Sequence, residues 1–287
     1  MSGPIIQVED VHVEYPVPGQ PDRRVLNGID LKIESGEFIS IVGQTGCGKS
    51  TLLRLILGEQ TPSRGRVLVN GRERWQPDRL CGYVPQKYSL FPDKTVIGNV
   101  IFGLDVTEFG ALSAFRPERR KRVREFRATA LRYLERMGLN GSDAGKYPHQ
   151  LSGGMQQRVA IAQALILQPP ILLMDEAFSA LDPVTRAGMQ RLIKELWSQS
   201  GTTIVFVTHN TREAVCLGTR VIALARSGGD SQTMNPGEAG ASVALDVSVP
   251  HLDFDSDEEE IRVLTRQIES ATLEVFPLST RVPAFRH

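Results

Sequence analysis

Hydrophobic positions along residues 1–226 fall into short strand-like segments separated by segments with helical spacing. Residues 5–15 alternate apolar and polar side chains, as a half-buried strand does. Further strand candidates, mostly short apolar runs, occur at 25–34, 37–42, 66–71, 80–85, 171–174, 202–207 and 221–225. Helical composition or spacing marks 52–57, 117–137, 155–167, 183–198 and 212–217. The alternation of strands and helices predicts an α/β core.

The pattern changes after Arg226. Residues 227–241 are rich in glycine and serine, as linkers are. Residues 243–249 are a strand candidate, and Ser256 and Glu259 form a capping box ahead of a helix. One face of that helix is apolar and consists of Ile261, Leu264, Ile268 and Val275. We therefore predict a main domain over 1–226, followed over 227–287 by a linker and a small C-terminal accessory segment for packing or dimerisation.

Composition changes this picture only slightly. The 287 residues include 33 basic and 33 acidic side chains, so no overall field attracts nucleic acid or a membrane. The arginine-rich run at 116–127 has no aromatic platform beside it, which favours a solvated helix face over a nucleic-acid site. The three cysteines show neither disulfide nor zinc spacing, and no leader or membrane-spanning run is found. We expect a cytoplasmic protein that reaches a membrane only through another chain.

Residues 43–51 fit the phosphate-loop pattern G-x-x-x-x-G-K-[ST] between a predicted strand and a predicted helix. Glycines let successive N–H groups converge on one anion, and the N-terminus of the following helix favours negative charge. Lys49 is placed to reach the β- and γ-phosphates, and the Ser50 hydroxyl to bind Mg²⁺. The predicted nucleotide-binding residues of this loop are Gly43, Gln44, Thr45, Gly46, Cys47, Gly48, Lys49, Ser50 and Thr51. Alone, the loop is compatible with a kinase, a GTPase or a transport ATPase.

Polar residues follow three other predicted strands. Asp175 ends the apolar run 171–174, where its carboxylate can hold Mg²⁺, and Glu176 can accept a proton from an attacking water. His209 follows the strand at 202–207 and can orient that water, although a histidine at a strand end is often only a satisfied polar group. Gln86 ends the strand at 80–85, from which its amide oxygen can join the metal shell. We predict that each of these groups lies at the tip of a strand and that Asp175 lies near Ser50 in the fold.

A second glycine-rich nest occurs at Ser152, Gly153 and Gly154, at the start of a predicted helix. The first loop already holds one triphosphate. A second nest is therefore most simply explained by two copies of the chain that face each other, each contributing its nest to the partner's nucleotide. This nest and Glu176 argue against a small-molecule kinase.

In this order, the motifs resemble those of the nucleotide-binding subunits of ATP-binding-cassette (ABC) transporters. The matching positions are Tyr15, Gly43 to Thr51, Gln86, the signature at 151–157, the Walker B strand 171–175 with Glu176, the D-loop at 179–182, and the switch histidine His209. The resemblance implies a RecA-like P-loop NTPase core of the ABC ATPase type, with an antiparallel β subdomain and a helical subdomain at about 92–160.

The resemblance also implies the roles of individual residues, with ATP and Mg²⁺ as cofactors. Tyr15 is expected to stack on adenine, and Glu176 to act as the catalytic base with His209 as its switch partner. Mg²⁺ is expected between Ser50, Gln86 and Asp175. Ser152, Gly153 and Gly154 are expected to bind the γ-phosphate across a homodimer, and Asp182 is a further expected nucleotide-binding residue.

Two phrases, at 147–155 and 177–182, look most like the nitrate/sulfonate/taurine importer branch. Methionine stands at position 155, where the general family signature has glutamine. The resemblance implies an importer ATPase that binds a second copy of itself and a membrane permease, works indirectly with a solute-binding protein, and binds no nucleic acid. A non-transport ABC ATPase acting on nucleic acid or ribosomes is the alternative. The solute cannot be deduced, because it is selected by other chains.

Overall fold

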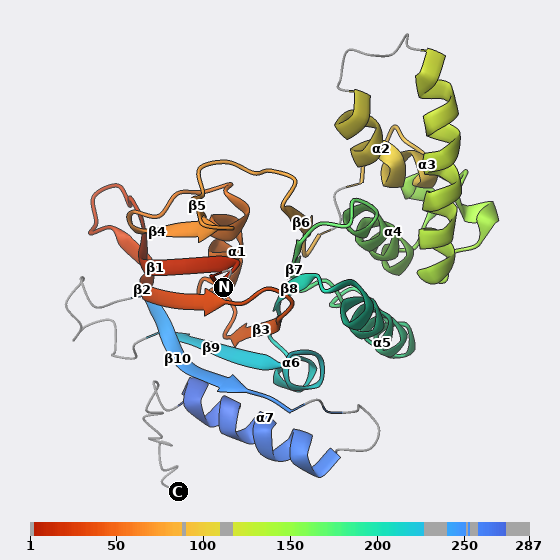
Figure 1. Cartoon of the computed structure of the whole chain (residues 1–287). Helices are drawn as coiled ribbons and strands as arrows, with labels where there is room; N and C mark the ends of the chain where they lie inside the picture. The colour runs from red at the N-terminus through yellow and green to blue at the C-terminus, as the bar shows by residue number, and fades with distance from the viewer. Residues whose placement is uncertain are drawn as a thin grey trace, which may run out of the picture.

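The structure is a computed structural model of the whole chain, and it describes residues 3–87, 90–109, 117–226, 240–250, 252 and 258–273. Within these ranges ten strands form one sheet, in the order β5-β4-β1-β2-β10-β9-β3-β8-β7-β6 (Figure 1). The strands are β1 Ile6–Tyr15, β2 Arg23–Ile33, β3 Phe38–Gly43, β4 Arg64–Val69, β5 Arg72–Glu73, β6 Cys81–Val84, β7 Ile171–Asp175, β8 Thr203–Val207, β9 Arg220–Arg226 and β10 Ala241–Ser248.

Seven α-helices surround this sheet in the described ranges. They are α1 Lys49–Leu57, α2 Val96–Phe109, α3 Pro117–Arg136, α4 Gly153–Leu165, α5 Pro183–Ser200, α6 Thr211–Leu217 and α7 Glu258–Leu273. Short 3₁₀ helices occur at Gly141–Asp143 and Pro148–Gln150. The helix predicted from Met155 begins two residues earlier, because the Ser152 hydroxyl accepts a hydrogen bond from the Met155 N–H and caps the first turn.

Strands β9, β3, β8, β7 and β6 are parallel and form the centre of the fold. Both faces of this part are covered, which explains why its strands are continuous apolar runs. In β3, Ile39 and Ile41 pack with α1 on one face, whereas Phe38 and Val42 belong to apolar clusters on the other face. The parallel arrangement brings the carboxyl ends of β3, β7 and β8 to one edge.

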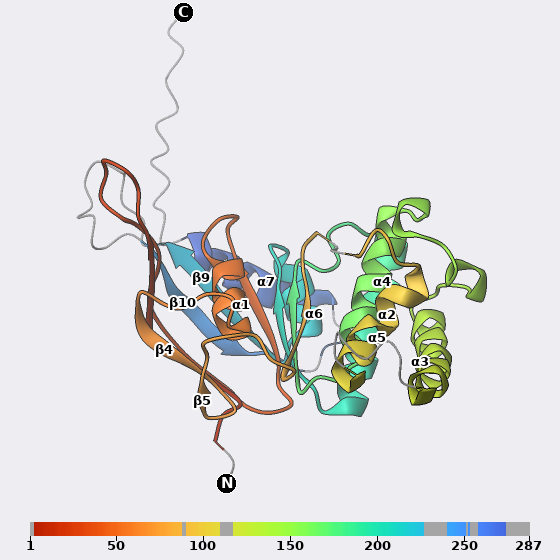
Figure 2. The same cartoon turned by 90° about the horizontal axis from the view of Figure 1, so that it is seen from above.

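The first strands form an antiparallel layer, as predicted. β1 lies between β2 and β4 and pairs antiparallel with both, and an Asn70-Gly71 turn joins β4 to β5. The helical subdomain begins beyond β6 at the opposite end of the molecule, where α2 and α3 pack beside α4 (Figures 1 and 2). The mixed α/β fold with β and helical subdomains is therefore confirmed.

The basic face of α3 is paired with acidic side chains of α2. Arg119 forms an ion pair with Asp105, and Arg122 forms one with Glu108. These contacts hold the two helices together across the arginine-rich run. They give part of that run a structural partner within the chain.

The C-terminal segment joins the main sheet. β10 runs antiparallel to β9 and meets β2 at Ala241, and α7 packs against α6 and β9. Ile261 and Ile268 are fully buried in a cluster with Val42 and Val215. The predicted strand and helix are thus both present, while Ser256, Val275 and most of the predicted linker lie outside the described residues. The domain boundary at 226 stays a prediction.

Candidate nucleotide site

The phosphate loop connects the buried strand β3 to helix α1 in the described structure. Gly48 caps α1 with a positive φ of 110°, and Gly58 ends the helix in the left-handed conformation. Gly43 also has a positive φ, and a Cβ there would lie 2.4 Å from the Leu224 carbonyl oxygen and 2.8 Å from Cys47 Sγ. Glycine is therefore required at this position by close packing as well as by backbone conformation.

The side chain of Lys49 is buried and folds back over the loop. Its Nζ donates to the carbonyl oxygens of Gly43 (2.8 Å) and Gln44 (3.0 Å), and only 5% of the residue is exposed. Its neighbour Cys47 is buried, and burial raises the pKa of the thiol, so this cysteine is a packed neutral side chain. The loop thus holds one buried ammonium group against its own backbone carbonyls.

The predicted acids lie at the end of β7, next to this loop. Asp175 is 5% exposed, and its Oδ1 is buried without a hydrogen-bond partner. Burial raises the pKa of this carboxyl and Glu176 adds to the rise, while a hydrogen bond from Ser50 and the charge of Lys49 oppose it. A buried acid oxygen with no partner, beside a serine hydroxyl, fits a hard cation with oxygen ligands. Ser50 and Asp175 are thus suited to hold Mg²⁺.

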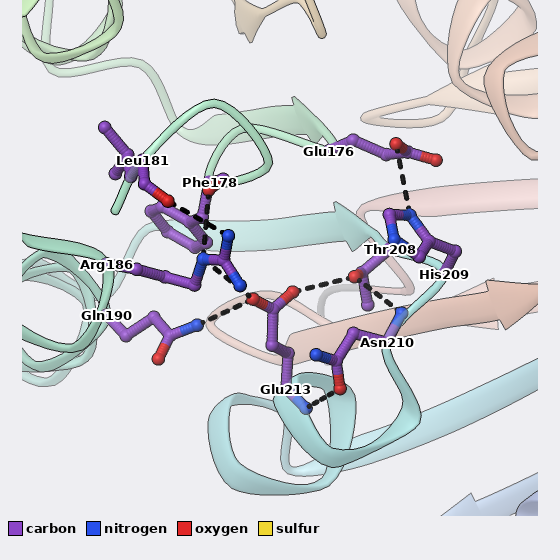
Figure 3. Close-up of polar contacts among 9 residues, drawn as sticks. All are labelled: Glu176, Phe178, Leu181, Arg186, Gln190, Thr208, His209, Asn210 and Glu213. Carbon is purple, nitrogen blue, oxygen red and sulfur yellow. Dashed lines mark hydrogen bonds and ion pairs between the residues drawn. The ribbon is translucent and has the colours of Figure 1, made fainter. Parts of the chain in front are cut away.

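Glu176 adopts a left-handed backbone conformation with φ of 46°, which is uncommon outside glycine and costs energy. Its Oε2 accepts a hydrogen bond from Gln86 Nε2 at 2.8 Å and lies 3.2 Å from His209 Nδ1 (Figure 3 shows the histidine contact). The structure therefore brings Gln86, Glu176 and His209 together. The Gln86 amide contacts the predicted base here, and its assignment as a metal ligand stays a prediction.

A cleft of about 640 Å³ opens over these groups. The predicted residues in its lining are Tyr15, Thr45, Gly46, Gly48, Lys49, Ser50, Thr51, Gln86, Glu176 and His209. Tyr15 is 38% exposed at the rim and donates from its hydroxyl to Gln60, so its ring is available at the cleft. Val17, Arg23 and Val25 complete the lining.

These last three residues were not predicted as site residues, and neither was Arg226. The Nη2 of Arg226 donates to the Gly46 carbonyl at 2.7 Å, so the end of β9 supports the phosphate loop. No local pattern marks these positions, because the sheet pairing alone brings them to the loop.

The second nest lies away from this cleft. Ser152, Gly153 and Gly154 start α4 and are not among the described residues that line the cleft, and Ser152 is exposed. Asp182 is exposed as well and caps α5 by accepting from the Thr185 N–H at 3.0 Å. Among the described residues, one chain therefore presents a nucleotide cleft and, separately, a glycine nest whose Ser152 is exposed and whose two glycines are half-buried. The predicted role of the nest in nucleotide binding stays a prediction.

A buried lysine on a glycine loop between strand and helix, with an acid pair on a nearby parallel strand, defines a nucleotide-hydrolysing site of the phosphate-loop class. Residues 26–179 match the family model described as ABC transporter. The chain belongs to this family, and it is an ATP-binding, ATP-hydrolysing member.

Several known proteins are similar over most of this chain. The aliphatic sulfonates import ATP-binding protein SsuB of Pseudomonas putida is 40% identical over 228 residues, covering 79% of this chain and 74% of SsuB. The nitrate import ATP-binding protein NrtC of Synechococcus elongatus is 40% identical over 221 residues, covering 76% of this chain and 32% of that longer protein. The predicted resemblance to the importer branch is thereby confirmed.

Solved structures show the same fold. The dimeric, post-hydrolysis structure of the ATP-binding cassette MJ0796 bound to ADP and phosphate has a TM-score of 0.69 and 32% identity, covering 86% of this chain and all of that one. CbiO1 of Clostridium perfringens, part of an ABC transporter complex, has a TM-score of 0.66 and 27% identity, covering 95% of this chain and 99% of that one. Among the described residues, no helix is long and apolar enough to span a membrane.

Proposed function

We propose that this chain is the ATP-hydrolysing subunit of an importer for small anionic or organic solutes, and that it works as an ATP-dependent homodimer with a separate permease. The observation that carries the proposal is the separation of the cleft from the exposed nest at Ser152. A twofold arrangement, with each nest closing the partner's cleft, accounts for both features. The dimeric state of the MJ0796 cassette supports it.

Within one cleft, Lys49 and the loop N–H groups hold the phosphates, and Tyr15 stacks on the base. Ser50 and Asp175, with Gln86 beside them, would hold Mg²⁺, and the bound cation would supply charge neutralisation at the phosphates. Glu176 accepts the proton of the attacking water, and His209, 3.2 Å from it, orients the carboxylate and the γ-phosphate. Gly153 and Gly154 add N–H donors from the partner copy.

The importer assignment rests on the relatives, two of which are named for nitrate and sulfonate import. The helical subdomain offers a place for the permease: Phe91 and Val106 are partly exposed apolar side chains of this subdomain. A nucleic-acid ATPase is less well supported. DNA-repair relatives in the family place a long coiled coil ahead of the signature, whereas the described residues between Gln86 and Ser152 form α2 and the 20-residue α3 instead.

The test is Glu176→Gln. Loss of the proton acceptor is expected to lower kcat by about a hundredfold or more. ATP binding should persist, and size-exclusion chromatography with ATP should show a stable dimer. The matched control is Glu135→Gln, which changes a carboxylate of α3, outside the cleft. Hydrolysis that continues in the Glu176 variant refutes the proposed base, and an ATP-bound monomer refutes the dimer.

The importer is tested by solute uptake. Cells that carry the Glu176 variant should lose uptake of nitrate or of an alkanesulfonate that the wild-type chain restores. If DNA or ribosomes stimulate hydrolysis and uptake of both solutes is unchanged, the alternative replaces the importer.

A further inference from the structure

Glu176 and His209 are connected by a second route besides their direct contact. They follow the neighbouring parallel strands β7 and β8, whose last pair is Asp175 with Val207. In the direct Glu176–His209 contact the His209 side chain is 58% exposed, whereas the Glu176 side chain is only 14% exposed. The solvent-exposed imidazole is therefore the less restrained partner of this contact. The additional contacts lie beneath it, away from the cleft, and are drawn in Figure 3.

Glu213, in the first turn of α6, is at the centre of these contacts. Its Oε2 accepts from the Thr208 hydroxyl at 2.8 Å, directly before His209 in the chain. Its Oε1 accepts from Gln190 Nε2 at 3.0 Å and lies 3.8 Å from Arg186 Nε. Only 13% of the Glu213 side chain is exposed. A shielded carboxylate that accepts hydrogen bonds through both oxygens restrains the groups that donate to it.

Arg186, in α5, extends the contacts to the other loop. Its Nε donates to the Phe178 carbonyl at 3.2 Å, and its Nη2 donates to the Leu181 carbonyl at 3.0 Å. These carbonyls belong to the loop 177–182, which directly follows Glu176. The planar guanidinium therefore holds this loop through two hydrogen bonds. A lysine ammonium lacks the fixed, forked arrangement of N–H groups and cannot reproduce both bonds. The loop begins at the strained backbone of Glu176, so its position bears on that residue.

These contacts close a ring through both predicted catalytic residues. It runs from Glu176 to His209, along the chain to Thr208, through Glu213 to Arg186, and back through the Phe178 carbonyl. The first turn of α6 needs none of this for its own formation, because Asn210 caps it by accepting from the Glu213 N–H. The Glu213 side chain is thus left to join loops that are far apart in sequence.

We propose that Glu213, acting through Thr208 and Arg186, is a positioning residue that sets the loop 177–182 and Glu176 in place against His209 for hydrolysis. The inference rests on the proposed function, which gives Glu176 and His209 their roles. Hydrolysis is sensitive to such placement, because a displacement of about 1 Å can cost about a hundredfold in rate. Nucleotide binding depends on the phosphate loop, and among the described residues the hydrogen bonds and ion pairs of this ring do not extend to that loop.

The test measures steady-state ATPase kinetics of Glu213→Gln. Glutamine keeps the shape but removes the charge facing Arg186 and brings an amide N–H₂ against the surrounding donors. We expect kcat to fall about tenfold to a hundredfold, with KM for ATP within about twofold of wild type. The control is Arg212→Gln on the same helix, which removes an exposed ion pair with Glu258 and should leave both constants unchanged.

A second variant guards against a folding artefact. Arg186→Lys keeps the positive charge but loses the fork, and it should lower kcat to a similar extent. The Arg186→Lys, Glu213→Gln double variant should be no slower than the worse single variant, because residues that act as a unit are not additive. Additive losses, or a weaker affinity for ATP with kcat unchanged, overturn the inference. If Glu213→Gln is fully active while Glu176→Gln is inactive, only this inference fails. If Glu176→Gln is active, the proposed site itself fails.

Discussion

Asp175→Asn is expected to stabilise the nucleotide-free protein while removing its response to Mg²⁺. The carboxyl is 5% exposed, and one of its oxygens has no hydrogen-bond partner. The nearby ammonium of Lys49 is directed to two backbone carbonyls instead. The negative charge of the Asp175 carboxylate serves function because it attracts a cation. In the absence of a cation, the same buried charge lowers the stability of the folded protein.

The size of the effect follows from the unmade hydrogen bond. A buried polar group without a partner costs about 1–3 kcal/mol, and more when it is charged. Asparagine keeps the shape and removes the charge, but it leaves an amide in the same place. We therefore expect a net gain of about 1 kcal/mol, which for a chain of this size raises Tm by about 2 °C.

The pH dependence of stability is a separate check on whether Asp175→Asn stabilises or destabilises the protein. Burial raises the pKa of Asp175 above its ordinary value of 3.8, so the folded protein keeps this proton to higher pH than the unfolded chain does. The native state of the wild type is therefore progressively destabilised as pH rises from 3.8 through the raised pKa, and the full cost is present above it. The advantage of the variant should be largest at neutral pH and should shrink as pH approaches 3.8.

The assay is thermal unfolding in EDTA at several pH values, repeated with ATP and Mg²⁺. Mg²⁺ and ATP should raise the Tm of the wild type well above that of the variant, because ligand binding stabilises the native state. Asp143→Asn is the matched control: it is also buried, but hydrogen bonds from Lys146 and the Asn140 N–H lower its pKa, so this change should destabilise. A lower Tm for the Asp175 variant in EDTA would show that its carboxylate is already satisfied.

Two further predictions test the phosphate loop and the C-terminal segment. Gly43→Ala should abolish ATP binding in a fluorescence titration, since the added Cβ would lie 2.4 Å from the Leu224 carbonyl oxygen. The added Cβ of Gly46→Ala faces open space, so this variant should weaken binding less. Equal losses of affinity in the two variants would contradict the role of close packing at Gly43. Ile261→Ala, at a fully buried position of α7, should lower the free energy of unfolding by about 2–4 kcal/mol in urea, and Val263→Ala, 55% exposed, by far less. If the two α7 variants unfold alike, α7 does not share the main core.

The chemistry was predictable where a function is encoded within a few adjacent residues. The phosphate loop needs glycines, lysine and serine in one turn, and its glycine conformations and the buried lysine agree with that reading. The strand ends were equally predictable from the sequence, because an apolar run followed by Asp175 and Glu176 indicates both the strand and the residue at which it ends. Most strands and helices themselves followed from apolar spacing, including β10 and α7, whereas β5 and α2 were not among the strands and helices expected.

The remainder depended on pairing between distant segments. β10 enters the sheet between β9 and β2. This position depends on strand register and on hydrogen bonds to the neighbouring strands, which the sequence of the segment itself does not predict. The contact of Gln86 with Glu176 and the support of Gly46 by Arg226 join residues 90 and 180 positions apart.

The sequence by itself determined the nucleotide chemistry and the family, because the groups that bind phosphate are consecutive in the chain. The tertiary structure alone decided how Glu176 and His209 are held, since Glu213 and Arg186 lie on helices whose side-chain partners are set by packing. It also decided that Ser152 lies outside the cleft its own chain forms. Short-range chemistry can be recognised in a sequence, whereas the relative placement of loops is fixed by the free energy of the whole fold.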